Sequence, residues 1–286
     1  MNGMKRMLTA GGIVLLLAGA AIIWLSLPSS PVKAQFRRDV AAELHKNRLP
    51  RGGEAFTEAD FAHLPEAVQA YIKSCGYIGA AKMSWLGMEY RDVAFSQGRG
   101  STAMTIDYAQ YNFVSAPCRL AVIDSRLFGI PFEGYDYYRG GQGGMKGVLA
   151  KAITLFDQNG ADMDRACLVT FLAESMFAPS ILLQDYITLE ELNEHQVRAS
   201  ITYGGQTASG IFTFNARHEM TAFTTKDRAA TAADGSMEYV PWSALCTEYK
   251  TAADGIRRPT RFQAVWNYPD GDFTYFDGAI SAVTCG

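Results

Sequence analysis

The sequence lacks the closely spaced cysteines and histidines that metal and redox sites use. Its five cysteines are far apart, without a C-x-x-C pair, and its four histidines form no H-x-H or H-x-x-x-H cluster. Zinc sites and thioredoxin-type motifs are therefore not expected, and neither is a cofactor. The odd number and wide spacing predict mainly buried, apolar cysteines. One disulfide, for example Cys246–Cys285, remains an open alternative.

An excess of positive charge is also missing. The formal net charge is −3 and the Lys and Arg residues are scattered, so no nucleic-acid surface is expected. The stretch Gly140–Gly144 is not a Walker loop, because Met145 precedes Lys146 and Gly147 follows it. We interpret that stretch as a turn or bulge between strands. No G-x-S-x-G motif occurs, which argues against a serine hydrolase.

Only one apolar run is long enough to cross a membrane. Twenty-one uncharged residues, Met7–Leu27, follow Lys5 and Arg6, and as a helix they span roughly 31 Å, the thickness of a hydrocarbon core. We expect residues 1–27 to be an uncleaved single-pass anchor in the bacterial inner membrane. The alternative is a signal peptide cleaved near Ala34, although the apolar core is long for one.

The orientation of the anchor follows from its flanks. A short basic segment, an apolar core and the exit Pro28–Pro31 have the layout of an export signal, which favours a periplasmic body. Against this, Lys33, Arg37 and Arg38 lie just beyond the run, so the positive-inside count does not support export.

The remaining length suits one β-rich domain. About 230 residues follow the anchor and its linker, enough for a single all-β or α+β unit. We divide the rest into a polar tether over residues 28–56, with a short helix over Gln35–Asn47, and a soluble domain over residues 57–286. Pro50 and Gly52-Gly53 interrupt the tether.

A helix is expected before the strands. Thr57 and Asp60 have the spacing of a capping box, apolar residues recur at helical spacing over about 65–75, and Gly76 occupies a C-cap position.

After Gly79 the pattern becomes that of strands and turns. Dipeptides typical of hairpins punctuate the second half and favour antiparallel pairing; they are Gly204-Gly205, Asp234-Gly235, Asp254-Gly255 and Asp270-Gly271. Ten strands are predicted, over Met83–Phe95, Ser101–Ser115, Arg119–Phe128, Glu133–Arg139, His195–Tyr203, Gln206–Asn215, Glu219–Thr225, Ser243–Lys250, Arg257–Tyr268 and Phe273–Thr284.

One apolar helix interrupts the strands. Asp164 is its expected cap, and Phe177–Pro179 ends it. Its apolar stripe is Leu168, Phe171, Leu172, Ser175 and Met176. The predicted fold is mainly β (α+β): a curled antiparallel sheet, or half-barrel, of about ten strands, with one helix before it and this helix inserted mid-chain. The space between helix and sheet is either filled by side chains or holds an apolar ligand.

Candidate functional residues surround that space. Glu174 lies near the apolar stripe, where desolvation would suit it to proton transfer, with Asp136 or Tyr138 assisting; alternatively it is a surface glutamate or pairs with an arginine such as Arg165 or Arg198. The candidate ligand-binding side chains, for which core packing is the alternative, are Phe171, Leu172, Met176, Phe177, Phe212, Phe214, Trp266 and Tyr138.

Several stretches together resemble an uncharacterised family of bacterial membrane-anchored domains. They are Leu64-Pro65-Glu66 with Tyr71 and Gly76, the segments DYYRGGQGGM and FLAESMFAPSIL, and the closing Pro269-Asp270-Gly271 with Phe273-x-Tyr275. The resemblance covers about residues 60–284. It implies a fold similar to the lipoprotein carriers LolA and LolB, in which a curved half-barrel with helices in its mouth holds acyl chains. Met176-Phe177 stands where the family has a tryptophan-containing pair, and the lipidation cysteine of some carriers is missing.

Three functions remain. The favoured one is a binding module that holds a lipid or another apolar molecule beside the membrane. The second is an enzyme that uses the same cavity, and the third is a structural or interaction protein of the cell envelope with a solid core.

Overall fold

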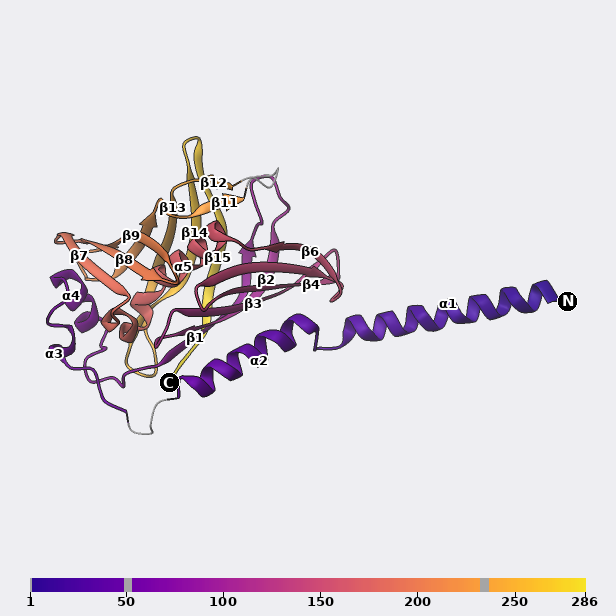
Figure 1. Cartoon of the computed structure of the whole chain (residues 1–286), viewed down its shortest axis with the longest axis horizontal. Helices are drawn as coiled ribbons and strands as arrows, with labels where there is room; N and C mark the ends of the chain where they lie inside the picture. Colours follow the sequence, from indigo (N-terminus) through magenta and orange to yellow (C-terminus); the bar gives the residue numbers. More distant parts are fainter. Residues whose placement is uncertain (1, 49–52, 232–236) are drawn as a thin grey trace.

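One antiparallel sheet dominates the computed structural model, which describes residues 2–48, 53–231 and 237–286 (Figure 1). Thirteen strands follow the order β6-β5-β4-β3-β2-β1-β15-β14-β13-β10-β9-β8-β7. The edge strands β6 and β7 do not pair with each other, so the sheet is curled but not closed. The strands are β1 (Trp85–Phe95), β2 (Met104–Phe113), β3 (Cys118–Leu127), β4 (Ile130–Arg139), β5 (Gln142–Leu149), β6 (Ile153–Gln158), β7 (Ile187–Asn193), β8 (Gln196–Tyr203), β9 (Gln206–Phe214), β10 (Met220–Thr225), β13 (Trp242–Thr251), β14 (Arg257–Tyr268) and β15 (Gly271–Cys285).

The prediction of a mainly β, antiparallel fold is confirmed, but the number of strands was wrong. Strands β5, β6 and β7 were not predicted, and neither was a separate two-stranded sheet of β11 (Ala229–Thr231) and β12 (Met237–Tyr239). Strand β5 contains three glycines, which suggested a turn, and β6 and β7 are edge strands with mostly exposed side chains. Edge and glycine-rich strands carry little of the apolar alternation on which strand prediction depends. The expected Asp234-Gly235 turn lies outside the described residues.

Within the domain predicted over residues 57–286, two helices precede the sheet where one was expected. Thr57 caps α3 (Glu58–Phe61) through the predicted capping box, in which Asp60 Oδ2 accepts from Thr57 N over 2.7 Å. The helix expected over about 65–75 is confirmed as α4 (Glu66–Ser74), and Gly76 follows it with a φ of +81°.

The segment expected to be a polar tether contains a packed helix. Helix α2 (Pro31–Lys46) buries Val32, Phe36 and Val40 against the outer face of β3 and β4. Tyr135 Oη also donates to Asp39 Oδ2 over 2.8 Å. The short helix predicted over Gln35–Asn47 therefore starts earlier and belongs to the folded body, because its apolar side chains find a cover on the sheet. Pro50 and Gly52 lie outside the described residues.

The apolar N-terminal run forms the 25-residue helix α1 (Asn2–Ser26), and in the described residues it is the part of the chain long and apolar enough to span a membrane. It projects away from the body in Figure 1. Its C-terminal end is nevertheless held: Lys151 Nζ donates to the carbonyls of Trp24 at 3.0 Å and Ser29 at 3.4 Å, and to that of Leu27. A lysine at the negative end of a helix dipole satisfies carbonyls that the helix leaves unpaired.

The inserted helix α5 (Ala161–Ala173) lies inside the curl of the sheet, in contact with β5 on one side and β9 on the other. Two 3₁₀ turns, Ser175–Phe177 and Pro179–Leu183, follow it. The prediction that Asp164 caps the helix was wrong, because Gly160 is the N-cap. The Asp164 carboxylate instead accepts from Gly143 N of β5 over 2.7 Å. Gly143 permits this approach, since a Cβ there would lie 2.8 Å from Cys167 Cβ.

The central pair β1 and β15 divides the sheet into two arms, one of strands β1–β6 and the other of strands β7–β10 and β13–β15. The two arms touch at their hairpin turns. Gly140-Gly141 joins β4 to β5 and Gly204-Gly205 joins β8 to β9, and all four residues have positive φ, as type I′ turns require. A Cβ on Gly204 would lie 2.4 Å from Gly141 Cα, so the two turns meet backbone to backbone. The rings of Tyr138 and Tyr203, just before these turns, meet at 6.5 Å.

This contact predicts different costs for two neighbouring glycines. Gly204→Ala brings both the strain of a positive φ, of order 1–3 kcal/mol, and a clash with the other arm. Gly205→Ala is the matched control, because its φ of +79° brings the same kind of strain but no atom lies within 4 Å of its Cβ. Urea unfolding of the full chain should therefore show a lower midpoint for Gly204→Ala than for Gly205→Ala. Equal midpoints would mean that the arms are not in contact.

Candidate functional site

Helix α5 divides the space inside the sheet into a solid half and a hollow half. The solid half holds the large apolar side chains of the helix and of the segment after it, which pack against α4 and strands β8–β10. Tyr71 and Tyr77 complete it by donating to the carbonyls of Met176 at 3.1 Å and Phe177 at 3.3 Å.

The hollow half is a cavity of about 710 Å³ between α5, strands β1–β6 and strands β13–β15. The helix turns small side chains toward it, at the helical spacing of Ala166, Thr170 and Ala173. The sheet contributes mainly aromatic side chains, among them Tyr90, Phe95, Phe156, Trp266, Tyr275 and Phe276. The volume falls within the range of about 300–1,000 Å³ that ligand pockets occupy.

A buried ionic cluster centred on Arg119 forms part of the cavity wall. Arg119 of β3 is 4% exposed; its Nε lies 3.0 Å from Glu174 Oε2 and its Nη1 lies 2.7 Å from Asp136 Oδ2. Its Nη2 donates to Tyr108 Oη over 2.6 Å, and Asn112 Nδ2 donates to Glu174 Oε2 over 2.8 Å. These groups are hereafter called the Arg119 cluster.

The partners of Arg119 keep its guanidinium charged although it is buried. Burial alone would lower the pKa of the Arg119 guanidinium, but the charges of Glu174 and Asp136 raise it well above its ordinary value. Burial raises the pKa of Tyr108, which therefore stays a neutral phenol. Arg119 is thus a permanent cation. The oxygens of Glu174, Asp136 and Tyr108 that surround it already accept its hydrogen bonds.

Two donors at the cavity are not bound within the protein. Gln110 Nε2 is buried and has no partner, and the same holds for Arg228 Nε. The Arg228 guanidinium carbon lies 4.7 Å from the centre of the Trp242 ring and 5.7 Å from that of Trp266. These cation–π contacts and the hydrogen bonds from Nη1 to Ala166 O and Thr170 Oγ1 hold the cation at the cavity wall, with its Nε–H left for an acceptor.

The predicted site residues separate between the two halves. Glu174 and Trp266 line the cavity, and Glu174 pairs with Arg119 rather than with Arg165 or Arg198. Asp136 also lines it. The other predicted ligand-binding side chains are at most 3% exposed and belong to the packed core; they are Tyr138, Phe171, Leu172, Met176, Phe177, Phe212 and Phe214.

Arg119 and Arg228 escaped the sequence analysis. A signal for Arg119 does exist, because Arg119, Ala121 and Ile123 alternate on the concave face of β3. The small residues Ala166, Thr170 and Ala173 also recur at helical spacing in α5, but the prediction used the large apolar side chains of this helix instead.

One of the five cysteines, Cys167 of α5, lines the cavity. All five cysteines are free, so the Cys246–Cys285 disulfide is absent; Cys285 is exposed and the others are buried. Burial raises the pKa of the Cys75 thiol to about 11, which makes it a poor nucleophile. Across the part of the chain that the structure describes, no three His, Cys, Asp or Glu side chains gather as metal ligands.

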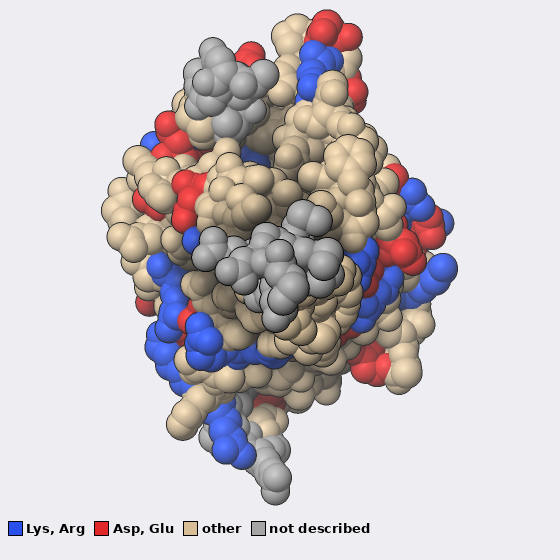
Figure 2. Space-filling model, turned by 90° about the vertical axis from the view of Figure 1, so that its right-hand side faces the viewer, with Lys and Arg blue, Asp and Glu red and all other residues tan. Residues whose placement is uncertain are grey.

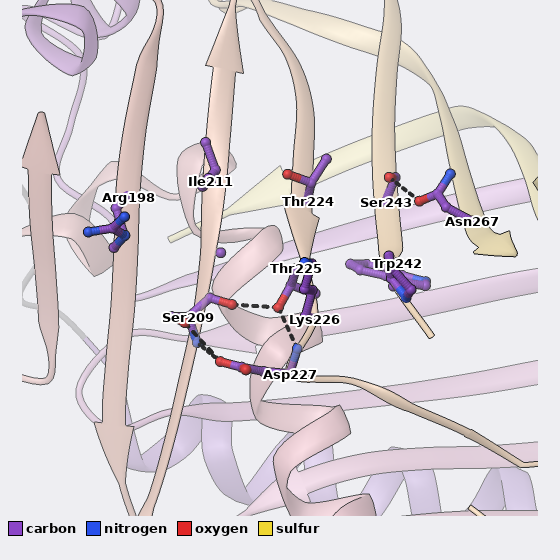
Figure 3. A pocket seen from close by; sticks show the side chains of 12 residues that line it. Arg198, Ser209, Ile211, Thr224, Thr225, Lys226, Asp227, Trp242, Ser243 and Asn267 are labelled. Atoms are coloured by element: carbon purple, nitrogen blue, oxygen red, sulfur yellow. Dashed lines mark hydrogen bonds between the residues drawn. The ribbon is translucent and has the colours of Figure 1, made fainter. Parts of the chain in front are cut away.

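A second, more open groove of about 560 Å³ lies on the outer face of β8–β10 and β13 (Figure 3). Its polar groups bind one another: Asp227 Oδ2 accepts from Ser209 N at 2.7 Å and from Ser209 Oγ at 2.8 Å, and Ser243 Oγ donates to Asn267 Oδ1 at 2.6 Å. Because these groups are already satisfied, the inner cavity is the stronger candidate.

Comparisons with known proteins agree with the expectation of an uncharacterised family. The family model described as a family of unknown function (DUF6544) matches residues 54–278, which include most of the sheet and all of α5. That expectation is confirmed. No curated protein matches the chain in sequence.

Two solved structures are similar to this chain. One is a domain described as an outer membrane lipoprotein-sorting protein, from Vibrio parahaemolyticus, with 10% identity and a TM-score of 0.41 over 77% of this chain and 91% of that one. The other is a DUF1329 family protein from Desulfovibrio piger ATCC 29098, with 8% identity and a TM-score of 0.34 over 81% of this chain and 94% of that one.

The Arg119 cluster predicts a strong dependence of stability on charge pairing. Arg119→Met leaves Glu174 buried without its cation, which should lower the free energy of unfolding by about 3–5 kcal/mol. Combining it with Glu174→Gln should cost less than the sum of the two single changes, because the double variant removes both charges. Urea titration of the full chain measures these values. The exposed Arg91, which pairs with Asp107 on the surface, is the control, since Arg91→Met should barely move the midpoint.

Proposed function

We propose that this chain, which belongs to the DUF6544 family of unknown function, is a membrane-anchored binding protein that holds a lipid or another apolar molecule beside α5. One observation carries the proposal: the same helix that packs solidly on one side faces a cavity of about 710 Å³ on the other. Protein interiors are normally filled to crystal-like density, so a space of this size with an aromatic wall suits an occupant.

The polar groups indicate how such an occupant would be oriented. Its apolar part would lie along the aromatic wall and the small residues of α5. Its acceptor group, such as a carboxyl, ester or phosphate oxygen, would face Gln110 Nε2 and Arg228 Nε, the two unpaired donors. A buried donor without a partner costs about 1–3 kcal/mol, which an acceptor on the ligand would recover.

An enzymatic use of the cavity has less support. Glu174 was the candidate acid or base, but both of its carboxylate oxygens already accept from Arg119, and Oε2 also accepts from Asn112. We therefore propose that Glu174 stabilises the cavity wall. A purely structural protein with a solid core is disfavoured by the cavity itself.

The proposed anchor is α1, retained as a single span of the inner membrane with the body on the periplasmic side. Retention is supported by Lys151, whose contacts with Trp24 and Leu27 a cleavage near Ala34 would remove. The basic Lys5-Arg6 pair before the apolar run supports the orientation.

Bound lipid provides the test of the binding function. The full chain is purified in amphipol, and the lipid extracted from it is identified and counted by mass spectrometry. Met163→Trp adds bulk at the cavity, and we expect it to lose about one bound molecule per chain. Ile211→Trp adds the same bulk in the outer groove and should retain the wild-type amount, because Ile211 lines that groove only.

Lipids that surround α1 are common to all three proteins, so the difference between them reports on the cavity. If Met163→Trp retains as much lipid as the wild type while both unfold at similar urea concentrations, the binding proposal is wrong.

A further inference from the structure

Two neighbouring hairpin turns expose large apolar side chains at one end of the sheet. Phe128 is 88% exposed, Ile130 40%, Ile153 57% and Leu155 48%. In the described residues, every other large apolar side chain as exposed as these belongs to α1, to Leu27 just after it or to β12. These four residues are hereafter called the apolar rim.

The rim residues come from two adjacent turns and the strands that follow them. Phe128 lies in the β3–β4 turn and Ile153 begins β6 just after the β5–β6 turn. The turns are adjacent, because Ala150 N donates to Pro131 O over 2.8 Å and Phe132 pairs with Leu149.

The backbone at Phe128 is unusual for this side chain. Phe128-Gly129 is a two-residue turn in which φ is +51° and +82°, as in a type I′ turn. Asn or Asp is the preferred first residue of such a turn, and a bulky residue at positive φ is strained. An exposed Phe in this position therefore lowers the free energy of unfolding of the isolated protein. Burial of this side chain against a partner would offset that loss.

The partner follows from the position of α1. Lys151, in the β5–β6 turn beside Ile153, binds the carbonyls of Trp24, Leu27 and Ser29, so the rim lies where the apolar helix leaves the body. Trp24 near the end of α1 is the residue type that prefers the membrane interface. A rim held at that level would reach the acyl chains just below the headgroups.

Charge on this side agrees with a lipid surface. Arg126, exposed beside the turn, donates from Nη1 to Gly129 O over 3.1 Å. Figure 2 views the molecule from the side on which α1 projects and shows Lys and Arg groups on the lower left and, next to acidic groups, on the right. Basic groups around an apolar insertion favour anionic lipids.

We propose that the apolar rim inserts into the leaflet from which α1 emerges, so that the protein has a second membrane contact besides its anchor. The proposal rests on α1 being the membrane anchor of the proposed function. It also places β6 between lipid and ligand, because Ile153 lies in the rim and Phe156 of the same strand lines the cavity.

The test uses the full chain in vesicles of phosphatidylcholine and phosphatidylglycerol, with the exposed Cys285 changed to Ala. Single cysteines that carry the fluorophore NBD replace Phe128, Leu17 of α1, or Glu190 on the far edge strand β7. Lipids with a nitroxide near the headgroup quench NBD at shallow depth, and lipids with a nitroxide near the end of the acyl chain quench NBD at the depth of residue 17. We expect the probe at 128 to be quenched at least about twofold more than the probe at 190.

The three positions separate the two proposals. If the probe at 17 is quenched and the probe at 128 is not, the rim proposal fails while the anchor stands. If the probe at 17 is not quenched, the anchor fails, and the rim proposal falls with it.

A second variant separates lipid contact from folding. Phe128→Asn supplies a residue suited to positive φ, so it should raise the urea midpoint of the full chain. It should also reduce the quenching of NBD at Ile153→Cys, because the leading apolar side chain of the rim is gone. A variant that is more stable but keeps the same quenching would overturn the proposal.

Discussion

The burial of α5 against both arms of the sheet is the constraint on which the rest of the structure depends. A sheet of thirteen strands with two free edges needs a filling to stay curled, and α5 provides it. The close contact between Gly143 and Cys167 brings β5 onto the helix, and the Asp164 carboxylate fixes the register between them. Once the helix holds both arms, the glycine turns at Gly141 and Gly204 can meet.

The same helix explains why the interior is half solid and half hollow. Apart from Met163, its large apolar side chains pack in the core, whereas Ala166, Thr170 and Ala173 face the cavity. A buried cation in the hollow half would be costly by itself, but Arg119 is held between Glu174 and Asp136. The cluster therefore makes a polar patch stable within an aromatic wall, and such mixed surfaces recognise molecules that have both an apolar and a polar part.

Local signals explain which parts of the fold were predictable from the sequence. Hairpin glycines such as Gly204 and the capping box at Thr57 act within a few residues, so antiparallel pairing and the early helix could be read directly. Strand β5 could not, because Gly143 is required by a helix that follows later in the chain, and Gly144 and Gly147 by the rings of Tyr137 and Phe156 on the neighbouring strands. The partner of Glu174 was equally hidden: Arg119 lies 55 residues away and is brought close only by the curl. Which side of α5 faces the cavity depends on the whole sheet. The sequence therefore predicted ligand contacts for Phe171 and Phe177 rather than for Ala166 and Ala173, which line the cavity.

The pairing of β1 with β15 at the centre of the sheet has a consequence for biogenesis. Leu86 lies opposite Cys285 and Phe95 opposite Phe276, so the two strands that join the arms are almost as far apart in sequence as the domain allows. Strand β15 leaves the ribosome after every other strand of the sheet. Until then each arm exists only as a meander of neighbouring hairpins, and β1 presents an unpaired edge at the future centre. Such non-local pairing is slow. In the proposed periplasmic location, a chain whose β1 edge is still unpaired needs protection from aggregation during that interval.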